Sequence, residues 1–139
     1  MKTDPQYLAD RYAATWTLSD AAERRASIEE LWARDGIHVL HPPEEIREAA
    51  AALGFAHTIL EARGYDAIEA RVTRSHEDFV EKRGITFRAR TDAVRLKRVV
   101  KFGWEAVSIE SGDVQGGGVE VLLLDEDGRI AADYMYPGT

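Results

Sequence analysis

A single glutamate interrupts an otherwise apolar stretch, residues 119–124. In a strand, side chains alternate between two faces, so Glu120 shares a face with the leucines two and four positions later. A carboxylate among apolar neighbours costs free energy unless it is paired or protonated, and burial raises its pKa. We predict that Glu120 lines a cavity. The alternatives are exposure at a sheet edge and a salt bridge to an arginine such as Arg88 or Arg90.

Two further side chains have acid–base chemistry. Tyr12 recurs with Leu8 and Trp16 at intervals of four, which places all three on one face of a helix. His41 ends a short predicted strand, and its imidazole is suited to general-base chemistry near neutral pH. The plainer interpretations are that Tyr12 is a core tyrosine whose hydroxyl finds one buried partner, and that His41 has no role.

Four residues are candidates for the wall of a pocket: Trp16, His76, Trp104 and Tyr136. The three aromatic residues fit an ordinary core equally well. His76 falls on the apolar face of a predicted helix, where a histidine is more often packed in the core than functional.

The sequence contains no complete set of metal ligands and no cofactor motif. His38 and His41 are three residues apart, an offset that places them on opposite faces of a strand. The acidic run 125–128 lacks the third ligand and distal glutamate of a calcium loop, and it predicts a hairpin turn. Residues 116–118, three glycines, precede a strand rather than a helix, which favours a bend over a phosphate loop. We expect no metal and no cofactor.

The elements that must position these residues change character along the chain. Helices are predicted from Asp4-Pro5, from Asp20 with Glu23 as a capping box, over residues 43–53 and from Gly64 to Glu81; Gly36 is expected to end the second, and residues 37–41 to form a strand. The segment 55–63 is ambiguous. Strands are predicted over 85–96, 99–109, 114–124 and 129–136. Helices followed by hairpins indicate an α+β fold with helices on one face of an antiparallel sheet.

The stretch 119–124 is apolar on both of its alternating faces, so both faces should be covered. Helices cover one. A second copy of the sheet would cover the other, which predicts a homodimer through the outer sheet face.

Length and composition indicate one domain, residues 1–139, with 45% hydrophobic and 31% charged residues. The net charge of −7 disfavours a nucleic-acid surface, and Arg95, Lys97 and Arg98 are expected to face water at a strand end. No apolar run is long enough to span a membrane. The sequence has no cysteine, and the expected location is the cytoplasm.

Five blocks in order resemble SnoaL-like domains of the nuclear-transport-factor-2-like superfamily. They are Tyr12-Ala-Ala-Thr-Trp16, Leu31-Trp32-Ala-Arg-Asp35-Gly36, Gly64-Tyr-Asp-Ala-Ile68, Val100-Lys-Phe-Gly-Trp104-Glu105 and Asp125-Glu-Asp-Gly128-Arg129-Ile130. The resemblance implies a cone of helices closed by a curved antiparallel sheet, with an internal pocket and pairing through the sheet. Ketosteroid isomerase, polyketide cyclases and limonene epoxide hydrolase share this scaffold, so the fold implies a pocket and not a reaction.

The resemblance also implies roles within the pocket. Tyr12 matches the isomerase tyrosine that donates to an oxyanion, and Glu120 matches its second donor, a protonated acid. His41 matches the aspartate that shuttles the proton, with an imidazole in place of the carboxylate. One hypothesis is therefore a non-catalytic domain that binds a small apolar molecule or mediates dimerisation, which the missing aspartate favours. The alternative is a cofactor-free isomerase, cyclase or hydrolase that uses Tyr12, His41 and Glu120.

Overall fold

A computed structural model describes residues 4–41, 48, 52–54 and 60–138. Along the described part of the chain, two helices, two strands and a further helical segment come first, and five strands follow. They are α1 (Pro5–Thr15), α2 (Ala21–Leu31), β1 (Trp32–Leu40), β2 (Leu60–Arg63), α4 (Gly64–Ser75), the π-helix η1 (His76–Glu81), β3 (Ile85–Ala89), β4 (Val94–Leu96), β5 (Val99–Ser108), β6 (Val114–Leu124) and β7 (Ile130–Pro137).

Both N-terminal helices begin where the sequence predicts. The Asp4 carboxylate accepts a hydrogen bond from the Tyr7 backbone N–H, and the Asp20 carboxylate accepts one from the Glu23 N–H. The predicted end of the second helix at Gly36 is wrong, because β1 already begins at Trp32. A Cβ at Gly36 would lie 2.7 Å from the Ile130 carbonyl oxygen, so glycine is needed there for close approach of two strands.

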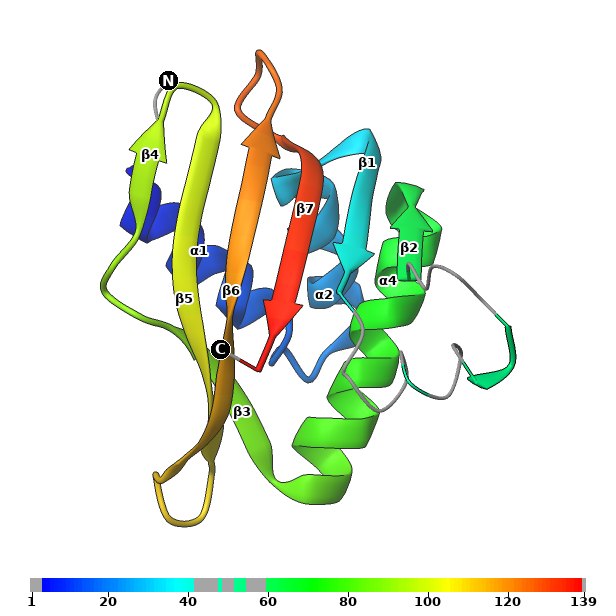
Figure 1. Cartoon of the computed structure of the whole chain (residues 1–139), viewed down its shortest axis with the longest axis vertical. Coiled ribbons are helices and arrows are strands. Elements are labelled where there is room, and N and C mark those ends of the chain that lie inside the picture. The colour runs from blue at the N-terminus through cyan, green and yellow to red at the C-terminus, as the bar shows by residue number, and fades with distance from the viewer. Residues whose placement is uncertain (1–3, 42–47, 49–51, 55–59, 139) are drawn as a thin grey trace.

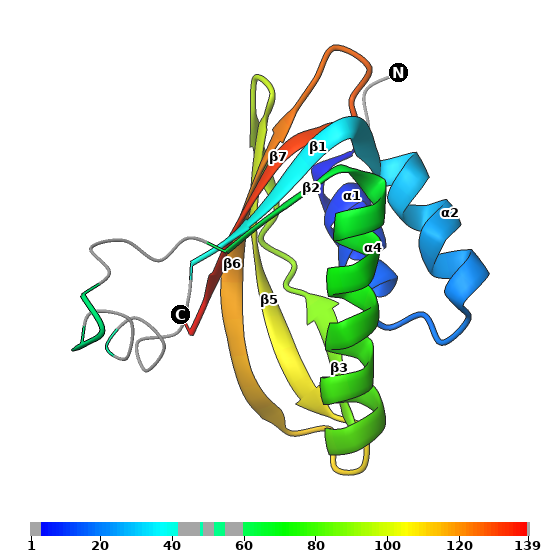
Figure 2. The same ribbon diagram turned by 90° about the vertical axis from the view of Figure 1, so that its right-hand side faces the viewer.

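Seven strands form one curved sheet in the order β2-β1-β7-β6-β5-β3, with β4 also paired to β5 (Figure 1). The expectation of a wholly antiparallel sheet is wrong at one place, because β1 and β7 run parallel. A side view shows α1, α2 and α4 on one face of the sheet (Figure 2). The fold is therefore α+β, with a mixed sheet.

Several predicted boundaries change in detail. The predicted strand 85–96 is two strands, β3 and β4, because the chain leaves the sheet between them. The predicted helix 64–81 is present, with its last part as η1. The segment 55–63 ends in β2. Most of the predicted helix 43–53 and residues 55–59 lie outside the described residues.

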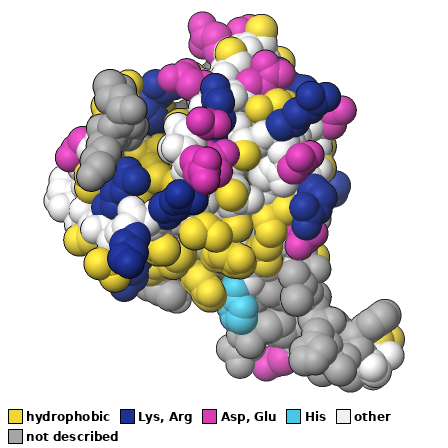
Figure 3. Space-filling view, turned by 90° about the horizontal axis from the view of Figure 1, so that it is seen from above, with side chains coloured by type: hydrophobic (Ala, Val, Ile, Leu, Met, Phe, Trp, Pro, Cys, Tyr) yellow, Lys and Arg dark blue, Asp and Glu magenta, His cyan; other side chains and the backbone are white. Residues whose placement is uncertain are grey.

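The helix-covered face of the sheet holds the core. Tyr12, Ile28, Trp32 and Phe102 are buried there with their neighbours. The opposite face carries exposed or half-buried apolar side chains from the three central strands: Val99, Val119, Val121, Leu123, Tyr134 and Tyr136. Seen from above, hydrophobic side chains gather along the lower edge of the molecule, on this uncovered side (Figure 3). None of the helices in the described ranges has the length and apolar character needed to cross a bilayer.

Candidate functional site

A cavity of about 460 Å³ lies between the helices and the sheet. Its walls are mainly apolar, and Tyr12, His38 and Glu120 bring polar atoms to its lining. Trp16, Phe79, Phe87 and Trp104 are among the aromatic residues that line it. This volume and this mixture of many apolar and few polar groups are typical of small-molecule sites.

Gly118 makes room for one of these aromatic walls. It pairs across the sheet with Trp104, and a Cβ built on Gly118 would lie 2.4 Å from Cζ2 of the indole. Gly116 and Gly117 line the cavity beside it, and the β5–β6 register shifts between Ala106 and Val107. The extra residue of this bulge is Gln115, so the three glycines keep regular pairing with β5 directly beside the bulge.

Three buried side chains from α1, β6 and β7 meet through one hydroxyl group. The Tyr12 hydroxyl oxygen lies 3.0 Å from Glu120 Oε2 and 2.5 Å from Asp133 Oδ2. Helical spacing aims Tyr12 into the interior, and strand alternation aims Glu120 and Asp133 toward the same face. All three side chains have almost no exposed surface.

Hydrogen counting defines the charge of this group. The Tyr12 hydroxyl has one proton and can donate it to only one of the two carboxyl groups. The shorter contact is with Asp133, so a proton on Glu120 is needed for the second hydrogen bond, with Glu120 donating to the Tyr12 oxygen. Burial raises the pKa of Glu120 well above its ordinary value of 4.5, and the Asp133 charge raises it further. Burial and the Asp133 charge likewise raise the pKa of Tyr12. The three groups share two protons and one negative charge.

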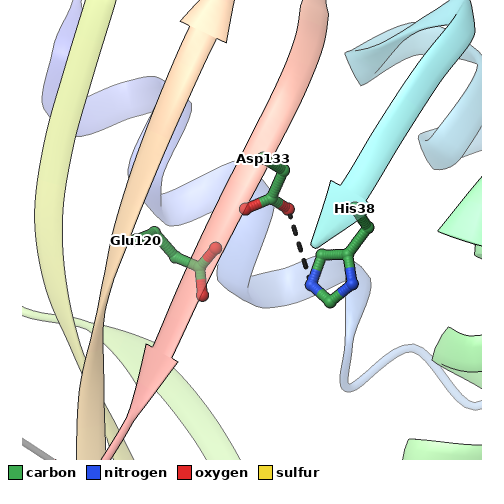
Figure 4. A group of neighbouring side chains, drawn as sticks. All are labelled: His38, Glu120 and Asp133. Carbon is green, nitrogen blue, oxygen red and sulfur yellow. Dashed lines mark ion pairs between the residues drawn. The ribbon is translucent and has the colours of Figure 1, made fainter. Parts of the chain in front are cut away.

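His38 on β1 completes the polar floor of the cavity (Figure 4). Nη1 of Arg71 lies 2.9 Å from His38 Nδ1, and a guanidinium only donates, so Nδ1 accepts and the ring proton is on Nε2. His38 Nε2 lies 3.8 Å from Asp133 Oδ2. Burial lowers the pKa of His38, with a further contribution from Arg71 against the attraction of Asp133. His38 is therefore a neutral donor that faces the two carboxyl groups.

Three buried atoms of these side chains have no hydrogen-bond partner in the described part of the chain: His38 Nε2, Glu120 Oε1 and Asp133 Oδ1. Donor atoms of these residues lie within 4.8 Å of one another, a spacing that would also admit a cation. However, the Tyr12 hydroxyl bridges the two carboxyl groups, and the Arg71 cation contacts the other nitrogen of His38. Both features favour shared protons over a metal ion.

The structure brings two of the three predicted chemical residues together, Tyr12 and Glu120. It does not bring His41 to them: His41 is exposed and stacks on Tyr136, with ring centroids 5.8 Å apart. The expected position of His41 is corrected in favour of His38, which lies on the opposite, buried face of β1. The prediction that the two histidines face opposite ways is confirmed.

Of the four predicted wall residues, Trp16 and Trp104 line the cavity. Tyr136 does not, because alternation along β7 directs it to the uncovered face, where 43% of it is exposed. His76 is buried outside the cavity lining, with Nδ1 3.8 Å from Glu81 Oε1. The alternative salt bridge of Glu120 to Arg88 or Arg90 is not formed, because both arginines pair with Glu105.

Sequence reasoning missed Asp133, Arg71 and the role of His38. Asp133 could have been found as the one charged residue of an otherwise uncharged strand, two positions before Met135 on the same face. The pairing of His38 with Asp133 depends on the parallel contact between β1 and β7, for which the sequence gives no local signal.

No protein-family model and no curated protein matches the chain. Solved structures do match. A SnoaL-like family protein from Agrobacterium tumefaciens, described as a candidate isomerase, superimposes with a TM-score of 0.76 at 21% identity over 97% of each chain. An NTF2-like protein of unknown function from Exiguobacterium has a TM-score of 0.61 at 19% identity, covering 94% of this chain and 97% of its own. A protein of unknown function with a cystatin-like fold, from Methylobium petroleophilum, has a TM-score of 0.60 at 14% identity, covering 99% of this chain and 80% of its own.

These similarities define the class: the chain has the fold shared by SnoaL-like and NTF2-like proteins. The resemblance of the sequence to that superfamily is confirmed at the level of the fold.

Proposed function

We propose that this protein catalyses proton transfer on a small, mainly apolar carbonyl compound, without a cofactor. The observation that carries the proposal is the buried chain Glu120–Tyr12–Asp133, whose first two members line a mainly apolar cavity. A carboxyl group whose pKa is raised toward the working pH is an effective carrier of protons.

The proposed cycle moves one proton at a time. A proton passes from Glu120 through the Tyr12 hydroxyl to Asp133, which leaves Glu120 ionised beside the ligand. Glu120 then removes a proton from the carbon next to the ligand carbonyl, and the electron pair moves to the carbonyl oxygen. His38 Nε2–H donates a hydrogen bond to that oxygen. Glu120 returns the proton to another carbon of the conjugated system, which completes an isomerisation.

The test uses 3-cyclohexenone, a small ketone whose double bond is not conjugated. In D₂O we expect the protein to accelerate its conversion to the conjugated ketone, with deuterium incorporation followed by NMR. Glu120→Gln should abolish the acceleration while the protein stays folded, and Glu110→Gln, a change at an exposed glutamate, should not. Equal rates with and without the native protein would remove the catalytic proposal.

A second candidate function is ligand binding without turnover. It is favoured by the position of Asp133, which does not itself line the cavity and whose contact with Tyr12 also serves stability. This function predicts that small apolar ketones bind and quench the fluorescence of Trp16 and Trp104, with no proton exchange.

We also propose that two copies of the chain pair through the uncovered face of the sheet. Support comes from the apolar side chains on that face, including Val121, Leu123 and Tyr134, over which the described helices do not pack. The cytoplasm remains the proposed location, since the sequence contains no cysteine.

A further inference from the structure

One edge of the Arg71 guanidinium group has no partner among the described residues. Its three hydrogen bonds all come from Nη1, at 2.9 Å to His38 Nδ1, 3.0 Å to the His38 carbonyl oxygen and 3.2 Å to the Leu60 carbonyl oxygen. All three acceptors are neutral. Nε and Nη2 bind no atom of the described residues, and no carboxylate of those residues forms an ion pair with Arg71. Since Nε and Nη2 match the two oxygens of a carboxylate, this edge is an anion-binding group.

Arg71 belongs to a cavity wall that continues along the same helix. Arg71, Ser75 and Phe79 line the cavity at intervals of four residues, and Arg83 follows at the same interval. The guanidinium carbon of Arg83 lies 5.0 Å from the centre of the Phe79 ring, and Arg83 forms no ion pair within the described ranges. One wall therefore carries two cations, a hydroxyl group and an aromatic ring.

Negative charge to balance these cations is scarce at the cavity. Among the described residues that line it, Glu120 is the single acid, and hydrogen counting makes it protonated. Asp133 lies on the far side of His38 from Arg71, so its charge acts on Arg71 without direct contact, and it is not part of the lining. Within the described residues, the cavity thus combines apolar walls with one wall that carries two cations and no paired carboxylate.

We propose that the ligand of this cavity is a small carboxylic acid with an apolar body, bound as the carboxylate to Nε and Nη2 of Arg71. The Ser75 hydroxyl, one helical turn further on, supplies a third donor. The apolar body packs against Phe79, Phe87 and Trp104. This inference deepens the proposed function by naming a substrate class, and it rests on ligand binding in the cavity but not on turnover. Because Arg71 contacts His38 directly, a carbonyl group a few bonds from the carboxylate would lie near His38 and Glu120.

The test compares three probes of equal length: octanoate, octan-1-ol and octylammonium. Binding is measured at neutral pH by calorimetry and by quenching of tryptophan fluorescence. We expect the native protein to bind octanoate at least about tenfold more tightly than octan-1-ol, since charge-assisted hydrogen bonds contribute on that scale. Octylammonium should bind most weakly. If octan-1-ol binds as tightly as octanoate, or octanoate does not bind at millimolar concentration, the proposal is overturned without any variant.

Two variants test whether Arg71 causes the preference for octanoate over octan-1-ol. Arg71→Gln should bring octanoate and octan-1-ol within about twofold of each other, because one neutral amide replaces the charged edge. The matched control is Arg74→Gln, an exposed arginine on the same helix that pairs with Asp78 and does not line the cavity. It should keep the full preference; equal losses in the two variants would overturn the assignment to Arg71.

Arg71 also forms hydrogen bonds to His38, so its substitution could disturb the site. Ser75→Ala provides a second test that leaves these hydrogen bonds in place. It should weaken octanoate binding about threefold and leave octan-1-ol unchanged. Neither measurement needs turnover. If the native protein catalyses proton exchange on 3-cyclohexenone but does not prefer octanoate to octan-1-ol, this inference alone is refuted. If it prefers octanoate but catalyses no exchange, the catalytic proposal alone is refuted.

Discussion

The hydroxyl group of Tyr12 on α1 lies 2.5 Å from Oδ2 of Asp133 on β7, although 121 positions separate the two residues. This contact joins the first helix to a central strand beneath the cavity. It is buried on both sides, so neither group has water as a substitute partner. The same hydroxyl group therefore contributes to stability and to the proposed chemistry.

Tyr12→Phe should lower the free energy of unfolding by about 1–3 kcal/mol, because it leaves buried carboxyl oxygens without a donor. Urea denaturation measures the loss. The matched control is Tyr7→Phe on the same helix, where the tyrosine is 56% exposed and its hydroxyl accepts a bond from Arg11. We expect the control to change stability by less than about 0.5 kcal/mol. Similar small effects at both positions would show that the buried contact contributes little.

Glu120→Gln should change how stability depends on pH. The folded protein holds the Glu120 proton above the ordinary pKa of 4.5, whereas the unfolded chain releases it there. Native stability contributed by Glu120 is therefore present below pH 4.5 and falls as pH rises toward the folded pKa, by up to about 1.4 kcal/mol per pH unit. Glutamine does not titrate, so the free energy of unfolding of the variant should increase relative to that of the native protein as pH rises.

Thermal unfolding of both proteins between pH 4 and pH 8 checks this expectation. Glu110→Gln, at an exposed position, is the control and should follow the native curve. If the stability of Glu120→Gln instead decreases relative to the native protein as pH rises, Glu120 is an ionised, stabilised carboxylate.

Substitution by alanine should have different effects on stability at two glycines of β6. A Cβ at Gly118 would lie 2.4 Å from the Trp104 indole, whereas one at Gly116 meets no atom within 4 Å. Gly118→Ala should displace the indole, cost about 1–3 kcal/mol of stability and shift the tryptophan emission. Gly116→Ala should leave both nearly unchanged. Equal behaviour of the two variants would contradict the close packing of Trp104 on Gly118.

Leu123→Glu should dissociate the proposed homodimer, because it places a charge among the apolar side chains of the uncovered sheet face. Sedimentation at micromolar concentration should give a dimer for the native protein and a monomer of 15.5 kDa for the variant. Ile109→Glu introduces the same charge at a similarly exposed residue beyond the end of β5 and should remain dimeric. A monomeric native protein would rule out this dimer, and a dimeric Leu123→Glu protein would move the interface elsewhere.

Extensive chelation should leave the melting temperature unchanged. The shared protons of Tyr12, Glu120 and Asp133 already balance the floor of the cavity, and Arg71 places a positive charge beside it. If chelation lowered the melting temperature and added zinc restored it, the donor atoms of His38, Glu120 and Asp133 would be the place to search for the ion.

Local patterns predicted the parts of the site that depend on one element. Period-four spacing placed Tyr12 and Trp16 on the buried face of a helix, and alternation placed Glu120 on the buried face of a strand. Both patterns report which side of an element is apolar, and burial follows from that.

The remaining parts depend on which elements become neighbours. The sequence of residues 37–41 predicts two histidines on opposite faces but not which face is buried. The family resemblance points to His41, whereas His38 is the buried residue. Asp133 gained its meaning only from its position between Leu122 on β6 and His38 on β1. Such pairings join distant segments, and no local spacing encodes them.

The position of β7 in the sheet has a consequence for how the molecule assembles. Although β7 follows all the other strands along the chain, it lies between β1 and β6, so the two halves of the sheet share no hydrogen-bonded edge until it inserts. Loop-closure entropy must be paid before this long-range pairing stabilises anything, which makes such a step slow. During synthesis on a ribosome, β1–β2 and β3–β6 would therefore remain two separate parts of the sheet, each with an unpaired edge strand, until β7 is made. The polar floor would then arise in the last folding event, and refolding kinetics followed at Trp16, which packs on His38, would report that event late.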